Sequence, residues 1–322
     1  MPDSPIPALD PIPALDPIPA LDIGGSHVTA ALADIQAGRL VPGTRVRIEV
    51  DPDASARDII GAWASAAQRL DTDSRLWGVA MPGPFDYRRG IGDFAGVGKF
   101  AALAGADVGT ALSAGIGVGA RTVFVNDADA YALGEWLACP RPRPRRLVGI
   151  TLGTGVGTGF VDQGRLITSG PTVPPDGSAY LLWIDGRPLE ETASSRAVLA
   201  AYRSRTGSPI DDVATLVRWA RAGDDLAYRT FRQAWTAAAQ ALAPYLQAFR
   251  ATEVVVGGSI ARSWDLVRPA LEDGLAGHDP TLLARLQLRP SQDPEASALL
   301  GAARSALQVD AGPEDEVRPS SA

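Results

Sequence analysis

The chain has 322 residues and a mass of 33.6 kDa, enough for about two domains at roughly 150 residues each. Its net charge of −7 disfavours nucleic-acid binding. A single cysteine, Cys139, and only two histidines exclude a disulfide framework and a Cys/His zinc site. The sequence has no apolar run of membrane-spanning length and no basic-then-apolar leader, so a cytoplasmic protein without membrane contact is expected.

The two ends of the chain differ from its middle. Residues 5–22 are three copies of Pro-Ile-Pro-Ala-Leu-Asp, and their prolines oppose both helices and sheet ladders. We therefore predict a disordered tail over residues 1–16, whereas the third copy leads into a first strand at Ala20–Ile23. Residues 310–322 are acidic and rich in proline and serine, which predicts a second disordered tail.

The first half of the chain alternates strand-like and helix-like patterns. Apolar strand patterns and helical periodicity predict strands at 28–32, 45–50, 76–80 and 122–125, and helices at 54–70 and 107–114. Residues 17–121 are predicted to form an N-terminal α/β domain, and a helix is predicted at 128–138. The segment at 139–146, CPRPRPRR, is interpreted as a solvated linker, with phosphate binding as the alternative.

The second half begins with two more strands and then becomes mostly helical. We predict strands at 147–152, 157–162 and 253–256, a long helix at 224–249, and a final helix at 295–307. The aromatic stripe of the long helix, which includes Trp235, is interpreted as core packing. Residues 122–309 are predicted to form a larger C-terminal α/β domain, with the final helix a candidate to pack back on the N-terminal domain.

Three glycine clusters each follow an apolar strand, at residues 21–26, 150–159 and 254–259. Glycine lets backbone N–H groups approach an anion closely, and the adjacent Ser and Thr hydroxyls add donors. No cluster has the Gly-Lys-Ser/Thr of a P-loop. The second cluster leads into another strand, whereas a dinucleotide fingerprint leads into a helix. The three clusters together predict a nucleotide held between two domains.

Two acidic positions at strand ends are candidates for chemistry. Asp22 precedes the first glycine pair and could hold Mg²⁺ through water, or simply cap a turn. Asp127 follows an apolar strand and could take a proton from a hydroxyl that attacks a phosphoryl group, with Asn126 bound to the same polyol. Alternatively, Asp127 is the N-cap of the next helix, and Asp129 is the other candidate carboxylate.

These pieces together resemble the ROK family of sugar kinases and repressors. The matching motifs are DIGGS at 22–26, MPGPFD at 81–86, VNDADAYALGEW at 125–136, ITLGTGVGTGFVDQG at 150–164 and VVVGGSIA at 254–261. The resemblance implies a two-domain α/β fold of the actin-like (ribonuclease-H-like) ATPase type, with a cleft between the domains. It also implies ATP with Mg²⁺, the base Asp127 and the sugar contact Asn126. The implied phosphate and nucleotide contacts are Asp22, Gly24, Gly25, Ser26, Thr151, Gly153, Thr154, Gly155, Gly257 and Gly258.

The chain also departs from the family pattern. Zinc-containing members have a Glu-x-Gly-His sugar contact and a cysteine-rich zinc loop, but residues 164–189 contain no Glu, His or Cys. We therefore predict no structural zinc and an altered acceptor site, with Glu190 as an acceptor contact. Lys99, in the segment that replaces the family's Asn-Leu acceptor segment, either contacts the acceptor or is a solvated loop lysine.

The resulting prediction is an ATP-dependent kinase that phosphorylates a hydroxyl of a small carbohydrate or related polyol. The absence of the Glu and His contacts favours an alternative, a non-catalytic sugar or nucleotide sensor, whereas retention of Asp127 and the phosphate motifs disfavours it. Either a monomer or a homodimer is expected. The sequence leaves the acceptor open, as well as the choice between ATP and polyphosphate as donor.

Overall fold

A computed structural model describes residues 16–310, so the two predicted tails lie almost wholly outside the described residues. The first sheet has the strand order β3-β2-β1-β5-β8, and β4 also pairs with β2. Its strands are β1 (Ile18–Ile23), β2 (His27–Asp34), β3 (Arg39–Leu40), β4 (Val46–Glu49), β5 (Leu76–Met81) and β8 (Arg121–Asn126). A small hairpin, β6 (Phe85–Asp86) with β7 (Ile91–Gly92), follows β5.

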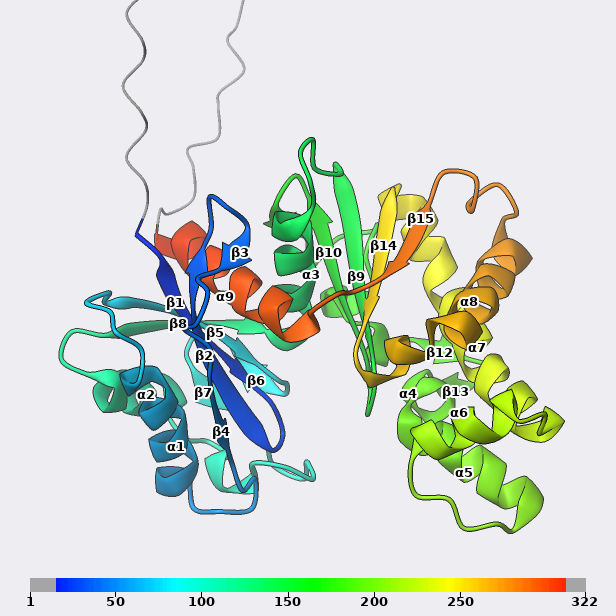
Figure 1. Cartoon of the computed structure of the whole chain (residues 1–322), viewed down its shortest axis with the longest axis horizontal. Helices are drawn as coiled ribbons and strands as arrows, with labels where there is room; N and C mark the ends of the chain where they lie inside the picture. Colours follow the sequence, from blue (N-terminus) through cyan, green and yellow to red (C-terminus); the bar gives the residue numbers. More distant parts are fainter. Residues whose placement is uncertain (1–15, 311–322) are drawn as a thin grey trace, which may run out of the picture.

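Helices cover both faces of this sheet. One face packs α1 (Ala56–Gln68) and α2 (Val108–Ile116), with Trp63 of α1 fully buried. The opposite face is rich in alanine and packs α9 (Pro294–Asp310), which comes from the end of the chain. We refer to this sheet with α1, α2 and α9 as the first unit; it is on the left in Figure 1.

The second sheet has the order β11-β10-β9-β14-β15. Its strands are β9 (Arg146–Leu152), β10 (Val156–Asp162), β11 (Arg165–Leu166), β14 (Glu253–Gly257) and β15 (Gln287–Pro290). One face packs α3 (Asp127–Ala138), and the other packs α7 (Asp225–Phe249) and α8 (Trp264–His278). A hairpin of β12 (Trp183–Ile184) and β13 (Arg187–Pro188) precedes α4 (Glu190–Ala193), α5 (Ser195–Thr206) and α6 (Val213–Arg221). These elements, α3 to β15, form the second unit.

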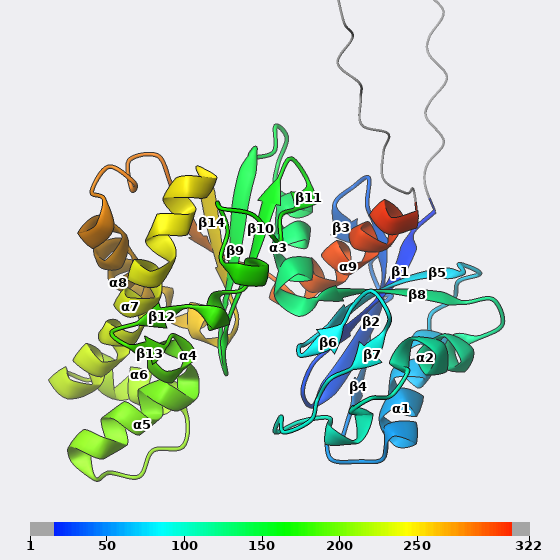
Figure 2. The ribbon, with the colours of Figure 1, turned by 180° about the vertical axis from the view of Figure 1, so that it is seen from behind.

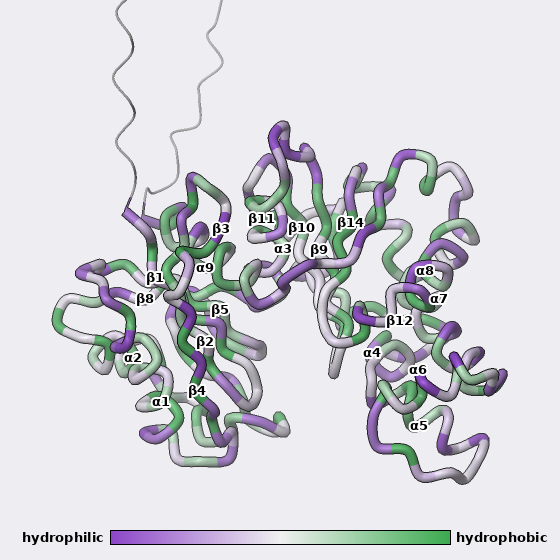
Figure 3. Tube along the Cα trace, viewed as in Figure 1, coloured by the Kyte–Doolittle hydropathy of each residue, from purple (hydrophilic) through white to green (hydrophobic). Residues whose placement is uncertain are grey.

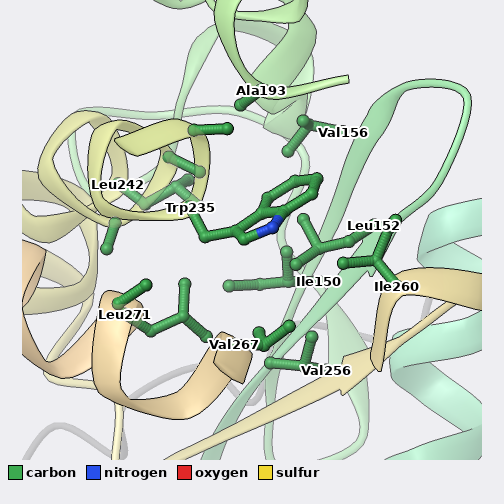
Figure 4. Close-up of a cluster of buried hydrophobic side chains, with 14 of the residues drawn as sticks. Ile150, Leu152, Val156, Ala193, Trp235, Leu242, Val256, Ile260, Val267 and Leu271 are labelled. Atoms are coloured by element: carbon green, nitrogen blue, oxygen red, sulfur yellow. The ribbon is translucent and has the colours of Figure 1, made fainter. Parts of the chain in front are cut away.

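The core of the second unit is centred on α7. Trp235 has no exposed surface and lies among apolar side chains of β9, β14 and α8, including Ile150, Val256 and Val267 (Figure 4). Figure 3 shows the same pattern along the chain, with hydrophobic segments on the strands and hydrophilic segments in the outer loops. The prediction that the aromatic stripe of this helix packs in the core is therefore confirmed.

The two units meet at a pair of closely packed helices, α3 and α9, which lie between the two sheets (Figures 1 and 2). Gly134 of α3 faces the backbone of Ser297, and Gly301 of α9 faces the backbone of Ala130. A Cβ atom on either glycine would collide with a carbonyl oxygen, so both positions require glycine for this close approach. The helix pair therefore forms a closely packed junction between the two sheets.

The strands and long helices predicted from the sequence are present, with shifts of a few residues at their ends. Two details differ from the predicted boundaries. Residues 122–126, assigned above to the C-terminal domain, belong to β8, which pairs in parallel with β5 of the first sheet. The final helix extends to Asp310, three residues beyond its predicted end. None of the helices within residues 16–310 combines the length and apolar character needed to cross a membrane.

Candidate active site

The strand ends of the first sheet bring three sequence motifs together. β1, β5 and β8 run parallel, and pairing places Asp22 beside Ala80 and Met81 beside Asn126. DIGGS, MPGPFD and the Asn126-Asp127 pair therefore lie along one edge of the sheet, at the carboxyl ends of its strands. In open α/β sheets this edge is where ligands bind.

The first glycine motif forms the turn between β1 and β2. The backbone N–H of Gly24 donates a 2.9 Å hydrogen bond to the carbonyl of His27, which closes the turn. Gly25 and Ser26 at its tip are exposed, so their N–H groups and the Ser26 hydroxyl are available to a ligand. The Ser26 hydroxyl lies 3.5 Å from Nδ1 of His27, at the limit of a hydrogen bond.

The second and third glycine motifs pack against each other at the edge of the second sheet. Thr151 pairs with Gly257, and Gly258 lies directly against the backbone of Leu152. Gly258 has φ +85°, a conformation that favours glycine, and an added Cβ would strike the Leu152 carbonyl. These glycines thus have a packing role, and they also bring two exposed loops to one place.

The tip of the second motif is a tight turn that is supported from behind. The N–H of Gly153 donates to the carbonyl of Gly155 at 3.1 Å. The carbonyl of Gly153 accepts two further hydrogen bonds from Ser195 of α5, from the backbone N–H at 2.8 Å and the hydroxyl at 2.7 Å. Thr154 at the tip is exposed. The turn is therefore held in place while its outer side stays free for an anion.

The Asn126-Asp127 pair lies at the start of α3, and the structure shows which of the two residues caps this helix. Asn126 is the N-cap of α3, and its side-chain oxygen accepts from the N–H groups of Ala128 at 3.0 Å and Asp129 at 3.3 Å. Asp127 is the first helical residue and is exposed. One oxygen of the Asp127 carboxylate accepts a 2.8 Å hydrogen bond from the N–H of Ala128, and the side chain remains exposed beside the strand ends.

Three carboxyl groups interact electrostatically at this edge. Limited hydration and the neighbouring charges of Asp127 and Glu295 raise the pKa of Asp22 to about 8. Limited hydration and the charge of Asp127 raise the pKa of Asp129 to about 7. The pKa of Asp127 is also raised by limited hydration, although Lys99 and the N–H of Ala128 oppose this rise. The site therefore places together carboxyl groups whose ionised forms a bound cation would stabilise.

Magnesium fits this arrangement. No group of three His, Cys, Asp or Glu side chains within residues 16–310 is placed to hold a metal ion by itself. Mg²⁺ commonly binds through one or two carboxylates, with water and substrate phosphates completing its shell. Asp22 supplies such a carboxylate beside the first glycine turn, and its pKa is raised mainly by burial although the charge of Arg47 opposes this rise.

Lys99 lies between the first glycine turn and Asp127. Its side chain is 3.9 Å from where a Cβ of Gly25 would be, and its charge lowers the pKa of Asp127. The structure records no ion pair or hydrogen bond for its ammonium group among the described residues. Lys99 is half-buried, so its side chain is not fully solvated.

Sequence reasoning missed two residues of this edge. The Tyr87 hydroxyl accepts a 2.9 Å hydrogen bond from Nδ2 of Asn126, and its pKa is raised mainly by burial and also by the charges of Asp127 and Asp129. Glu295 of α9 accepts hydrogen bonds from Thr29 at 2.7 Å and Arg47 at 3.0 Å. Tyr87 directly follows MPGPFD, which could have identified it, whereas no local signal marks Glu295.

Glu190 lies on the second glycine motif. Its carboxylate accepts a 3.3 Å hydrogen bond from the N–H of Val156 and covers Gly155, where an added Cβ would displace it. Among the described residues no contact joins it to Asn126 or Lys99. The structure therefore brings Asp22, Asn126, Asp127 and Lys99 together, and places Glu190 with the phosphate motif of the second unit.

Comparison with known proteins identifies relatives of this chain. The ROK family profile matches residues 18–174 and 185–309. A glucokinase from Thermotoga maritima is 29% identical over 209 residues, which is 58% of this chain and 65% of that protein. An N-acetylmannosamine kinase from Citrobacter koseri is 32% identical over 151 residues, 44% of this chain and 51% of that protein. The chain thus aligns with less than two thirds of the length of these relatives.

Solved structures agree on the fold. A ROK hexokinase from Thermus thermophilus superposes with a TM-score of 0.75 at 26% identity, covering 92% of this chain and 99% of that one. A ROK glucokinase from Streptomyces griseus, in complex with glucose and AMPPNP, has a TM-score of 0.70 at 23% identity, covering 91% and 99%. These matches confirm the predicted two-domain α/β fold of the actin-like ATPase type. Its glycine motifs, its fold and the profile match over most of its length show that this chain belongs to the ROK family.

Proposed function

We propose that this protein transfers the terminal phosphoryl group of ATP to a hydroxyl of a small carbohydrate or polyol. The observation that carries the proposal is the exposed Asp127 carboxylate at the strand ends, at the start of a helix whose N-cap is Asn126. It lies at the strand ends between the first glycine turn and Asn126, where a donor phosphate and an acceptor hydroxyl could meet. The kinase relatives from Thermotoga maritima and Citrobacter koseri support the same reaction class.

In this proposal Asp127 is the general base. Its carboxylate accepts the proton of the acceptor hydroxyl as the hydroxyl oxygen attacks the terminal phosphorus of ATP. The bond from that phosphorus to the bridging oxygen breaks, so ADP leaves with the bonding electron pair. The raised pKa of Asp127 brings the carboxylate closer to the pH at which a general base works best.

The glycine motifs would hold the donor. Gly24, Gly25 and Ser26 on one side, and Thr151, Gly153, Thr154 and Gly155 on the other, are proposed as the phosphate contacts. Gly257 and Gly258 would flank the nucleoside part. Mg²⁺, held through water by Asp22, would neutralise charge on the phosphates. The Streptomyces griseus glucokinase that shares this fold was solved with AMPPNP, which supports ATP as the donor.

The acceptor would lie beside Asn126, Tyr87 and Lys99. We place the segment of the second unit that contains Tyr180 across from these residues, because Tyr180 is near enough to contribute to the raised pKa of Tyr87. This segment exposes large apolar surface: Tyr180 is 51% exposed and Trp183 is 66% exposed. Such a wall favours an acceptor with an apolar substituent, for example a deoxy or acylated carbon, over one with hydroxyls on every side.

Glu190, on the second unit, is proposed as a further contact to the acceptor. In the structure its carboxylate rests on the N–H of Val156, so this role requires the side chain to turn away from the glycine turn. Its present position has a further consequence, because a carboxylate beside Gly155 repels a phosphate group placed there.

An ADP-release screen over hexoses, N-acylated amino sugars, deoxy sugars and polyols tests the proposal. Wild-type protein should release ADP with at least one acceptor, and the Asp127→Asn variant should not. Wild-type protein that binds ATP but transfers phosphate to none of these acceptors would favour the sensor alternative.

A further inference from the structure

A cavity lies away from the glycine motifs, at the opposite end of the second sheet. It has a volume of about 960 Å³, and Glu253 and Gln287, the first residues of β14 and β15, line it. Gly257, at the other end of β14, belongs to the candidate active site. We call this space the rear cavity. Its size is within the range of small-molecule sites, roughly 300–1,000 Å³.

Both units and the junction between them form the walls of the rear cavity. The first unit contributes the β2–β3 turn, with Arg39, and also Arg45. The second unit contributes the loop from Cys139 to Pro144 and the starts of β14 and β15, and the segment that leads into α9 closes the remaining side. The shape of the cavity therefore depends on how the two units are oriented.

The floor of the cavity is a buried polar cluster that is satisfied internally. Glu135 is 3% exposed and accepts hydrogen bonds from Arg289 at 2.9 Å, Ser297 at 2.9 Å and Ser291. Arg289 also donates to Glu253, and Arg45 pairs with Asp293 at 2.7 Å. The carboxylates of the cavity wall are thus matched with cations and are not available to bind another cation.

Two arginines that line the cavity have no such ion-pair partner among the described residues. Arg39 in the first unit and Arg285 in the second are exposed, and within residues 16–310 the structure records no hydrogen bond or ion pair for either guanidinium. The charge of Arg285 lowers the pKa of Asp279, but the two groups form no ion pair. In a chain with a net charge of −7, two uncompensated guanidinium groups that line one cavity, one from each unit, attract an anion.

The arginine-rich loop, which the proposed function leaves unexplained, forms one wall of the same cavity. The guanidinium of Arg143 stacks on Trp136 at 5.0 Å and donates to the carbonyl of Leu137 at 2.8 and 3.1 Å. These contacts hold the proline-rich segment in place, so this wall is rigid. The sequence interpretation of the loop as a solvated linker therefore describes only part of its role.

From these observations we infer that the rear cavity binds a phosphorylated small molecule through Arg39 and Arg285. A guanidinium fork matches phosphate oxygens in a bidentate geometry, and the amides of Gln287 and Gln292, which also line the cavity, suit a neutral polar part of the ligand. A ligand that bridges the two arginines would draw the rear walls together and hold the active-site side of the units apart. Such a ligand should therefore inhibit the proposed reaction.

A single helix provides the physical connection between the two sites. Asp127 begins α3 at the active-site edge, and Ala138 at its other end lines the rear cavity. Twelve residues of helix span about 18 Å. The coupling concerns the proposed function, but binding of the phosphorylated ligand does not depend on it.

Calorimetry with inorganic tripolyphosphate in EDTA, on the full chain, tests binding. The Arg39→Ala/Arg285→Ala variant should bind about tenfold or more weakly than wild type, because two charge-assisted contacts are lost. The control Arg57→Ala/Arg218→Ala removes the same charge from exposed arginines on α1 and α6 and should bind like wild type. The proposed binding site would be refuted if wild type did not bind tripolyphosphate, or if wild type and the first variant bound it with equal affinity. It would also be refuted if the control variant lost as much affinity as the first variant.

A second measurement tests the coupling. Tripolyphosphate should lower the maximal turnover of wild type and of the control variant, and should have much less effect on the Arg39→Ala/Arg285→Ala variant. Inhibition that ATP fully overcomes would place the tripolyphosphate in the active site and refute the coupling. If no variant turns over any acceptor, the proposed function fails, while calorimetry still decides whether the rear cavity binds the anion.

Discussion

Replacing Asp22 with asparagine should stabilise the ligand-free protein at neutral pH while impairing its proposed use of Mg·ATP. The pKa of Asp22 is about 8 in the folded protein against 3.8 as a model value. Between pH 5 and pH 7 this carboxyl group is therefore protonated in the folded state and ionised in the unfolded state. The folded state binds one more proton, so the free energy of unfolding falls as pH rises, by about 1.4 kcal/mol per pH unit.

This slope gives the size of the effect. An asparagine side chain cannot ionise, so the stability advantage of the Asp22→Asn variant over wild type should grow by about 2.7 kcal/mol between pH 5 and pH 7. Urea unfolding followed by tryptophan fluorescence, in EDTA and without nucleotide, measures both proteins at several pH values. Asp73→Asn, which replaces an exposed carboxylate in the loop before β5, is the control and should show no comparable growth.

A second arm connects the same residue to ligand binding. Addition of Mg·AMPPNP should stabilise wild type more than the Asp22→Asn variant at pH 7, because the proposed cation site needs the ionised carboxylate. A stability difference that stays constant with pH would refute the electrostatic reasoning. Equal stabilisation of both proteins by Mg·AMPPNP would show that Asp22 does not contribute to the proposed cation site.

Four further predictions concern the acceptor, the lysine, the core and metal content. Glucose should be a poor acceptor, and a sub-millimolar KM with ordinary turnover would contradict the altered acceptor site. Lys99→Met should move the acidic limb of the kcat/KM pH profile to higher pH, because Lys99 lowers the pKa of Asp127, and Lys99→Arg should restore it; an unmoved profile would show that the charge does not act on the base. Trp235→Ala should lower the free energy of unfolding by about 3–5 kcal/mol, measured by urea unfolding, and a loss below about 1 kcal/mol would contradict the central position of this side chain in the core. Elemental analysis of protein purified without chelators should find no stoichiometric zinc, and one zinc per chain would overturn the prediction drawn from residues 164–189.

The sequence was most informative where strands end. Glycine and aspartate after apolar strands predicted the turn at Gly24 and Gly25, and the edge where Asp22 and Asp127 meet. These signals are local, because a tight turn and an exposed carboxylate at a strand end depend mainly on a few adjacent residues. The fold class followed from the same alternation of strands and helices.

Features that depend on distant parts of the chain were beyond sequence reasoning. Glu295 reaches Thr29 only because α9 packs back across the first sheet. The position of Glu190 on Val156 depends on the path of the segment between β11 and α4. The choice of Asn126 over Asp127 as N-cap is a finer case: both residue types cap helices well, and the backbone geometry of α3 decides between them.

The proposed role of Asp127 as general base of phosphoryl transfer is tested most directly by comparing it with a neighbouring carboxylate. Steady-state kinetics on the best acceptor from the screen should show that Asp127→Asn lowers kcat by about 10²–10⁴-fold. Asp129→Asn removes a neighbouring carboxylate on the same helix and should retain most of the activity, with circular dichroism confirming that both variants are folded. Near-normal turnover in Asp127→Asn, or a comparable loss only in Asp129→Asn, would contradict the account.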